Sequence, residues 1–125
     1  SLKEIEKLNI LNASLLAMKR AIMKLKKKPG QILIDGNKIP KIKNYNLKYV
    51  VKGDQKIPEI SAASIIAKVS RDRLITKMSK KYIRYFWNKN AGYGTKDHLS
   101  AIKKFGITRH HRKTFQPIHN ILSLK

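Results

Sequence analysis

The feature that most constrains the fold of this chain is a pair of short segments rich in β-branched residues. They lie between longer segments with the apolar periodicity of helices. The run Gln31–Ile34 is typical of a strand covered on both faces, and Tyr49–Val51 predicts a second strand. The first strand stops at Asp35 and the second stops just before Asp54, each beside a glycine. Strands set among helices indicate an α/β fold.

Helix signals precede the strands. Ser1 and Glu4 have the spacing of a capping box at the start of a short helix, and a second helix is expected after Asn9. The basic segment 26–30, which contains a Pro-Gly pair, ends it. Apolar residues at three- and four-residue steps place one face of this second helix in the core: Leu11, Leu15, Met18, Ile22 and Leu25.

Two more helices are expected after the strands. Pro58 suits the first turn of a helix that extends to about Tyr82. Thr95 caps another helix, and Gly106 ends it. No repeat or linker marks a second domain, so residues 1–125 are expected to form a single domain fragment. In the helix that Thr95 caps, the residues expected to be buried are Leu99, Ile102 and Phe105.

The charge of the chain indicates its partner. Lys and Arg number 29 against 7 Asp and Glu, which gives a formal net charge of +22 over 125 residues. Such a surface is stabilised by a polyanion, so nucleic acid is the expected partner and a membrane surface the weaker alternative. No apolar run approaches the ~20 residues that cross a bilayer. The chain has no Cys, which fits a reducing compartment, and we expect a cytoplasmic protein.

Asp35 and Asp72 are the candidate catalytic residues. Ligand sites of open α/β sheets lie beyond the carboxyl ends of the strands, which is where Asp35 is expected. Asp72 is expected in mid-helix, where aspartate lowers helix propensity. The alternatives are a turn role for Asp35 and, for Asp72, an ion pair with Lys68 or a flanking arginine. Two carboxylates among many cations would suit a divalent metal bound to a phosphate backbone.

Five motifs, in this order, resemble those of the ribonuclease HII family. Segment 8–13 is similar to the family as well, so the resemblance covers almost the whole chain. The motifs are Ile34–Asn37, Val51–Asp54, Ile60–Arg73, Gly92–Thr95 and His111–Phe115.

The resemblance implies a fold and an activity. The fold would be a ribonuclease H-like mixed sheet flanked by helices, here an incomplete portion of it. The activity would be endonucleolytic cleavage of RNA in RNA/DNA hybrids, and of single ribonucleotides in duplex DNA, with Mn²⁺ or Mg²⁺. The full-length protein would be a monomer.

Site residues follow from the matched motifs. Asp35 corresponds to a metal-binding aspartate and Asp72 to the fourth active-site acid of the family. Tyr93, between two glycines, corresponds to the tyrosine that packs on the sugar at the RNA-to-DNA junction; core packing is its alternative. Lys52 and Lys68 are candidate nucleic-acid contacts.

The sequence departs from the family in one respect. The opening Asp-Glu motif and the Gly-Arg-Gly that follows it, which supply two of the four carboxylates and the loop that senses the ribose 2′-hydroxyl, are absent from these 125 residues. Glu4 and Glu6 lack the glycines of that motif, and a turn role is expected for Asp54. We therefore interpret the chain as the carboxyl-terminal part of the enzyme, inactive alone. The alternative is a noncatalytic, basic nucleic-acid-binding module derived from the same fold.

Histidines and aromatic residues cluster in the second half of the chain. The histidine spacing matches no common zinc site, so phosphate contact or packing near Phe115 is favoured. For the aromatic residues, core packing is favoured over base stacking. The histidines are His98, His110, His111 and His119, and the aromatic residues are Tyr82, Tyr85, Phe86 and Trp87.

Overall fold

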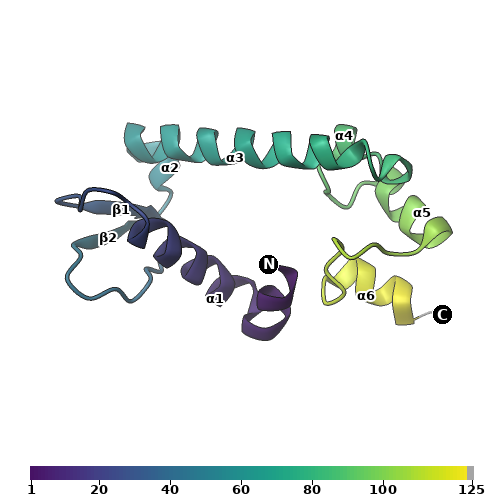
Figure 1. Cartoon of the computed structure of the whole chain (residues 1–125), viewed down its shortest axis with the longest axis horizontal. Helices are drawn as coiled ribbons and strands as arrows, with labels where there is room; N and C mark the ends of the chain where they lie inside the picture. Colours follow the sequence, from purple (N-terminus) through teal and green to yellow (C-terminus); the bar gives the residue numbers. More distant parts are fainter. Residues whose placement is uncertain (124–125) are drawn as a thin grey trace. The chain divides into compact units, whose positions relative to one another are not determined.

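The computed structural model describes residues 1–123, and its backbone contacts group residues 3–66 in a first unit and residues 67 onward in a second. The α/β class is confirmed, with six α-helices, one 3-10 turn and a two-stranded parallel sheet in the described residues. In chain order the elements are α1 (Leu2–Met23), β1 (Ile32–Asp35), β2 (Leu47–Val50), α2 (Gly53–Lys56), α3 (Pro58–Ser79), η1 (Ile83–Tyr85), α4 (Trp87–Asn90), α5 (Lys96–Phe105) and α6 (Gln116–Ser123) (Figure 1).

Helix α1 is two helical segments joined at Asn9, as the sequence predicted. The capping box is present, with Ser1 and Glu4 each satisfying the backbone of the other. Asn9 leaves the helical conformation at φ 66° and ψ 169°, and its side-chain Oδ1 accepts from the Asn12 backbone N–H at 3.0 Å. Asn9 is therefore the N-cap of the second segment.

The apolar face of α1 is buried less than expected. The helix ends at Met23, so Leu25 lies beyond it and is half exposed. Leu11 is also half exposed, and Ile22 is the buried member of the stripe. The periodicity identified the helix correctly, but burial depends on a covering partner that periodicity does not supply.

Strands β1 and β2 run in parallel, with Ile32 beside Leu47 and Asp35 beside Val50. The second strand starts earlier than predicted, at Leu47. The prediction that the first strand is covered on both faces is wrong for the described residues, because only Ile34 is buried in β1. The parallel register brings the carboxyl ends of both strands to one edge of the sheet.

Helix α3 has the predicted start, and its end at Ser79 lies close to the predicted one. Ile60 in its first turn is buried, whereas Leu74 in the same helix is more than half exposed. Ile65 and Ile66 are likewise exposed. None of the helices in residues 1–123 combines the length and apolar character needed to cross a membrane.

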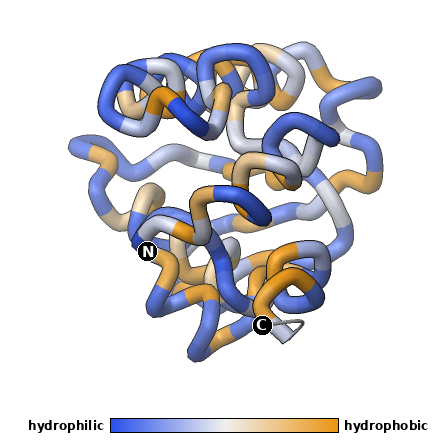
Figure 2. Tube along the Cα trace, turned by 90° about the vertical axis from the view of Figure 1, so that its right-hand side faces the viewer, coloured by the Kyte–Doolittle hydropathy of each residue, from blue (hydrophilic) through white to orange (hydrophobic). Residues whose placement is uncertain are grey.

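The second unit has its own hydrophobic core. Tyr85 and Trp87 are buried, which confirms core packing for these two aromatic residues. Phe105 was expected inside but is exposed, with the Arg84 guanidinium 4.9 Å from its ring centroid. Helix α6 was not predicted, and its apolar residues join this core; Figure 2 shows hydrophobic stretches near the C-terminal end of the trace. The core residues are Tyr85, Trp87, Ala101, Ile102, Ile118 and Ile121.

Candidate functional site

Asp35 is the last residue of β1 and projects at the carboxyl edge of the sheet. The Gly53 backbone N–H, just beyond the end of β2, donates to Asp35 Oδ1 at 2.8 Å. This hydrogen bond orients the carboxylate and leaves Oδ2 for another partner. The side chain is exposed, so a ligand can approach it.

The turn between β2 and α2 places the Gly53 amide. Lys52 has left-handed backbone angles, φ 55° and ψ 45°, which are uncommon for a residue with a side chain. A Cβ on buried Gly53 would lie 2.6 Å from Ile60 Cδ1 and 3.3 Å from Val50 Cβ. Glycine therefore allows the close approach on which the bond to Asp35 depends. Strained backbone of this kind is concentrated at functional sites.

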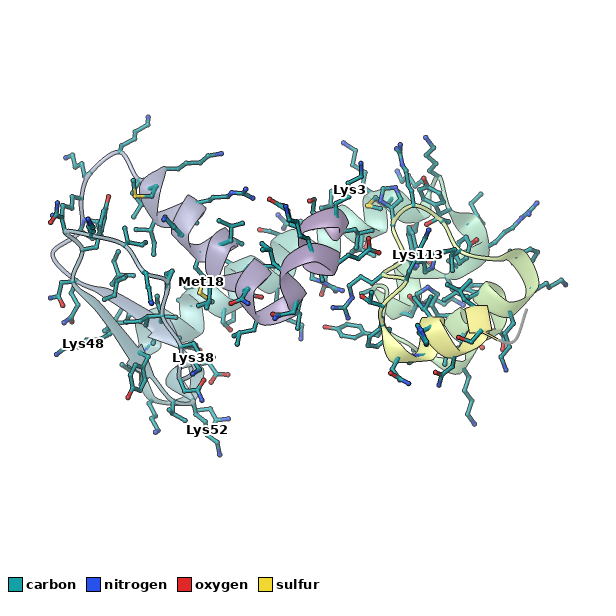
Figure 3. The ribbon with its side chains drawn as sticks, turned by 90° about the horizontal axis from the view of Figure 1, so that it is seen from below. Lys3, Met18, Lys38, Lys48, Lys52 and Lys113 are labelled. Atoms are coloured by element: carbon teal, nitrogen blue, oxygen red, sulfur yellow. The ribbon has the colours of Figure 1, made fainter. Side chains whose placement is uncertain are left out.

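The Lys52 side chain points into solvent. Its side chain is exposed and extends outward from the ribbon in Figure 3. It lies next to the glycine that binds Asp35, so its ammonium group is available to a phosphate at the same edge of the sheet. Asp54 is exposed in the first turn of α2, a position favoured by the helix dipole.

Asp72 lies on α3 in the second unit. Its Oδ1 accepts from Arg71 Nη1 at 3.0 Å, which is one of the ion pairs considered as its alternative role. Both side chains are more than a third exposed, and a pair of that kind contributes under about 1 kcal/mol. Lys68, one helical turn earlier, is exposed. The carboxylate remains accessible to a cation.

Tyr93 projects from a tightly held loop. Its ring is 59% exposed, so core packing is wrong for this residue. The Arg71 guanidinium lies 5.0 Å from the ring centroid, and the same guanidinium binds Asp72. The Tyr93 backbone N–H donates to the Asn90 carbonyl at 2.8 Å, and its carbonyl accepts from the Thr95 N–H at 2.9 Å. The second unit therefore joins Asp72, Arg71 and Tyr93 in one series of contacts.

Two histidines form part of the interior beside this loop. His98 and His111 are 4% and 5% exposed and hydrogen-bond to each other, so packing is their role in the fold. Trp87 Nε1 donates to His98 Nε2 at 3.0 Å. The sequence did not predict this cluster; the available signal was the position of His98 in the first turn of α5, close after the glycines that flank Tyr93.

Carboxylate oxygens are the ligands that Mg²⁺ and Mn²⁺ prefer. Asp35 in the first unit and Asp72 in the second each offer one accessible carboxylate, and residues 1–123 contain no group of three or more His, Cys, Asp or Glu side chains suited to a metal. Each aspartate thus supplies an oxygen ligand of the kind that these ions take, and each by itself is only part of a coordination sphere. That they share one metal pair stays a prediction.

Comparison with known proteins agrees with these motifs. A sequence model described as ribonuclease HII matches residues 1–118. This chain is 71% identical to the ribonuclease HII of Pelagibacter ubique (strain HTCC1062) and 50% identical to that of Cereibacter sphaeroides (strain ATCC 17029 / ATH 2.4.9). Each of these alignments covers 122 residues, which is 98% of the chain. It is 48% identical over 121 residues, 97% of the chain, to the ribonuclease HII of Neisseria meningitidis serogroup A. The chain spans 66%, 58% and 62% of the length of these relatives. With its motifs in family order and the match over nearly all of its length, the chain belongs to the ribonuclease HII family.

Proposed function

We propose that this chain is the carboxyl-terminal part of an endonuclease that cleaves the RNA strand of RNA/DNA hybrids and single ribonucleotides in duplex DNA. The observation that carries the proposal is the Asp35 carboxylate, held by the Gly53 amide at the carboxyl edge of the parallel strands, in a chain of the ribonuclease HII family. An otherwise strongly basic chain gains nothing for simple binding from an exposed carboxylate near a polyanion.

In this mechanism Asp35 and Asp72 would each supply a carboxylate to hold the divalent ions, Mn²⁺ or Mg²⁺, and the opening motif that these 125 residues lack would supply the other two. The ions, when bound, activate water and stabilise the departing 3′ oxygen. Gly53 keeps Asp35 Oδ1 fixed, so that the carboxylate need not reorganise when the phosphate arrives. The Arg71 guanidinium offsets the charge of Asp72 while no cation is bound.

Tyr93 contributes to the specificity of this mechanism, together with the Gly-Arg-Gly loop that these 125 residues lack. Its exposed ring packs against the sugar at the RNA-to-DNA junction, and Arg71 behind the ring holds its orientation. Lys52 and Lys68 contact phosphates of the duplex, and the net charge of +22 adds salt-sensitive affinity along the backbone. The protein acts in the cytoplasm as a monomer.

The test uses the chain extended at its amino end with the amino-terminal residues of the Pelagibacter ubique relative. A duplex DNA with one ribonucleotide is incubated with this extended form, with Asp35→Asn, with Asp72→Asn and with Asp97→Asn as the matched control, since Asp97 is an exposed aspartate of α5 outside the site. Nicking with Mn²⁺ or Mg²⁺ should fall by roughly 100-fold or more in the first two variants. The control should retain activity.

Binding separates the two proposed functions. Asp35→Asn should bind the hybrid as tightly as the parent or more tightly, because a negative charge near the phosphates is removed. Metal-independent binding without nicking by the extended form would instead identify a noncatalytic nucleic-acid-binding module. Parallel loss of binding and nicking in Asp35→Asn would indicate misfolding.

A further inference from the structure

The buried histidine pair ends at the backbone of the Tyr93 loop. His98 Nδ1 lies 2.8 Å from the Tyr93 carbonyl oxygen, and His98 Nε2 lies 3.1 Å from His111 Nε2. His111 Nδ1 in turn lies 2.9 Å from the Thr108 backbone nitrogen. A continuous series of hydrogen bonds therefore connects segment 108–111 to the loop that carries Tyr93.

The donors in this series determine which nitrogens carry the protons. The Thr108 backbone N–H can only donate, so His111 Nδ1 accepts and the His111 proton resides on Nε2. That proton is donated to His98 Nε2, whose single lone pair it shares with the Trp87 Nε1–H, which donates at 3.0 Å. His98 Nε2 is then an acceptor from both neighbours, and His98 must be protonated on Nδ1. The His98 Nδ1–H consequently donates to the Tyr93 carbonyl.

The bond from His98 adds to the local bonds that hold the Tyr93 loop, because the Tyr93 carbonyl accepts from the Thr95 N–H as well as from His98. Gly92 adopts φ 80°, and a glycine also follows Tyr93, so the flanking backbone is not restricted by side chains. The Tyr93 side chain is largely exposed, and its ring is contacted from one side by the Arg71 guanidinium, 5.0 Å from the ring centroid. The carbonyl of the residue is therefore where the buried interior can control the direction of the ring.

We propose that Trp87, His98 and His111 are positioning residues for Tyr93, acting as a neutral hydrogen-bonded relay that orients its ring for recognition of the ribonucleotide junction. The inference rests on the proposed function and adds the determinants of its specificity. A protonated imidazole donates from both nitrogens, so protonation of either histidine would remove an acceptor and break the relay. Burial lowers the pKa of His111 to about 4, which favours the neutral form that the relay needs.

The first experiment determines the protonation of the two imidazoles directly and does not depend on cleavage activity. In the extended form, ¹⁵N chemical shifts of the imidazoles at neutral pH should identify His111 as the Nε2–H tautomer and His98 as the Nδ1–H tautomer. Trp87→Phe removes one donor to His98 and should shift the His98 and Tyr93 signals. Opposite tautomers, or two charged imidazoles, would overturn the proposal whether or not the protein cleaves RNA.

The second experiment measures recognition in the Asp35→Asn background, so that the substrate stays intact. Discrimination is the ratio of dissociation constants for an all-DNA duplex and the same duplex with one ribonucleotide. Tyr93→Ala should lower this ratio by roughly five- to a hundred-fold, the range of one aromatic stacking contact. His98→Ala should lower it by a similar factor, and adding it to Tyr93→Ala should cause no further loss.

Controls keep the outcomes distinct. His119→Ala changes an exposed histidine of α6 and should leave the ratio unchanged. If His98→Ala does not fold, two other variants test the role. His98→Gln, whose amide can accept from Trp87 and donate to Tyr93, should keep the discrimination ratio of the unmutated relay. Trp87→Phe should lower this ratio. Unchanged discrimination in His98→Ala, or losses that multiply with Tyr93→Ala, would overturn the positioning role. If the Asp35→Asn extended form itself shows no preference for the ribonucleotide, the proposed function is overturned. The tautomers measured in the first experiment would still test the relay.

Discussion

Gly53 acts at the scale of a single residue, because its missing side chain lets its amide reach Asp35. Gly53→Ala would place a methyl group against Ile60 and Val50, and we expect about 1–3 kcal/mol of destabilisation and a roughly 10-fold loss of nicking in the extended form. Gly30→Ala is the control, because a Cβ there meets no atom within 4 Å. Equal activity of the two variants would show that the Gly53–Asp35 bond is dispensable.

His111 predicts a pH dependence of stability. Burial, with His98 nearby, lowers the pKa of His111 to about 4, from an ordinary value of 6.5. Between these values the unfolded chain binds more protons than the folded one, so the free energy of unfolding rises with pH across this window and is fully developed above pH 6.5. The loss from pH 7 to pH 4.5 should be roughly 2 kcal/mol. Urea titrations followed by Trp87 fluorescence should show it, and His111→Gln should abolish most of it.

Asn9 operates at the scale of an element, since it both interrupts α1 and caps its second segment. Asn9→Ala removes the acceptor for the Asn12 amide but keeps a Cβ at φ 66°, so the chain should lose about 1–2 kcal/mol of stability and some helical signal in circular dichroism. Asn9→Gly is the matched variant, because it loses the cap but tolerates the backbone angle. A glycine variant less stable than the alanine variant would contradict this interpretation.

Uncovered apolar residues set the behaviour of the whole molecule. Ile65, Ile66, Leu74 and Ile83 are 59%, 67%, 59% and 76% exposed, and large apolar side chains left in water favour association. We expect the 125-residue chain alone to bind a hydrophobic dye such as ANS, to melt in a broad transition and to show no Mn²⁺-dependent nicking. Duplex DNA should raise its solubility by neutralising the charge of +22, without restoring cleavage.

The extended form serves as the comparison in that experiment. It should bind less dye, melt more sharply and nick the ribonucleotide-containing duplex. Sharp melting and turnover by the 125-residue chain would contradict the prediction, and would mean that Glu4, Glu6, Asp54 or a second subunit completes the site.

Local signals in the sequence determined three helix starts and the strand-end aspartate. The capping box of Ser1, the interruption at Asn9 and the cap at Thr95 were all predicted correctly, because each depends on atoms within three residues along the chain. Asp35 was expected at a strand end for a similar reason, since a β-branched run followed by Asp-Gly is a local pattern.

Only the tertiary structure decided what these residues contact. The bond from Gly53 to Asp35 joins residues 18 apart, and the bonds from His98 to Trp87 and His111 span 11 and 13 residues. No local periodicity encodes such pairs, because they form when separate elements meet in the folded chain. Burial is also decided by the tertiary structure. Phe105 and Leu74 lie at the spacing expected of a buried helix face, but they are exposed because a residue is buried only where another element covers it.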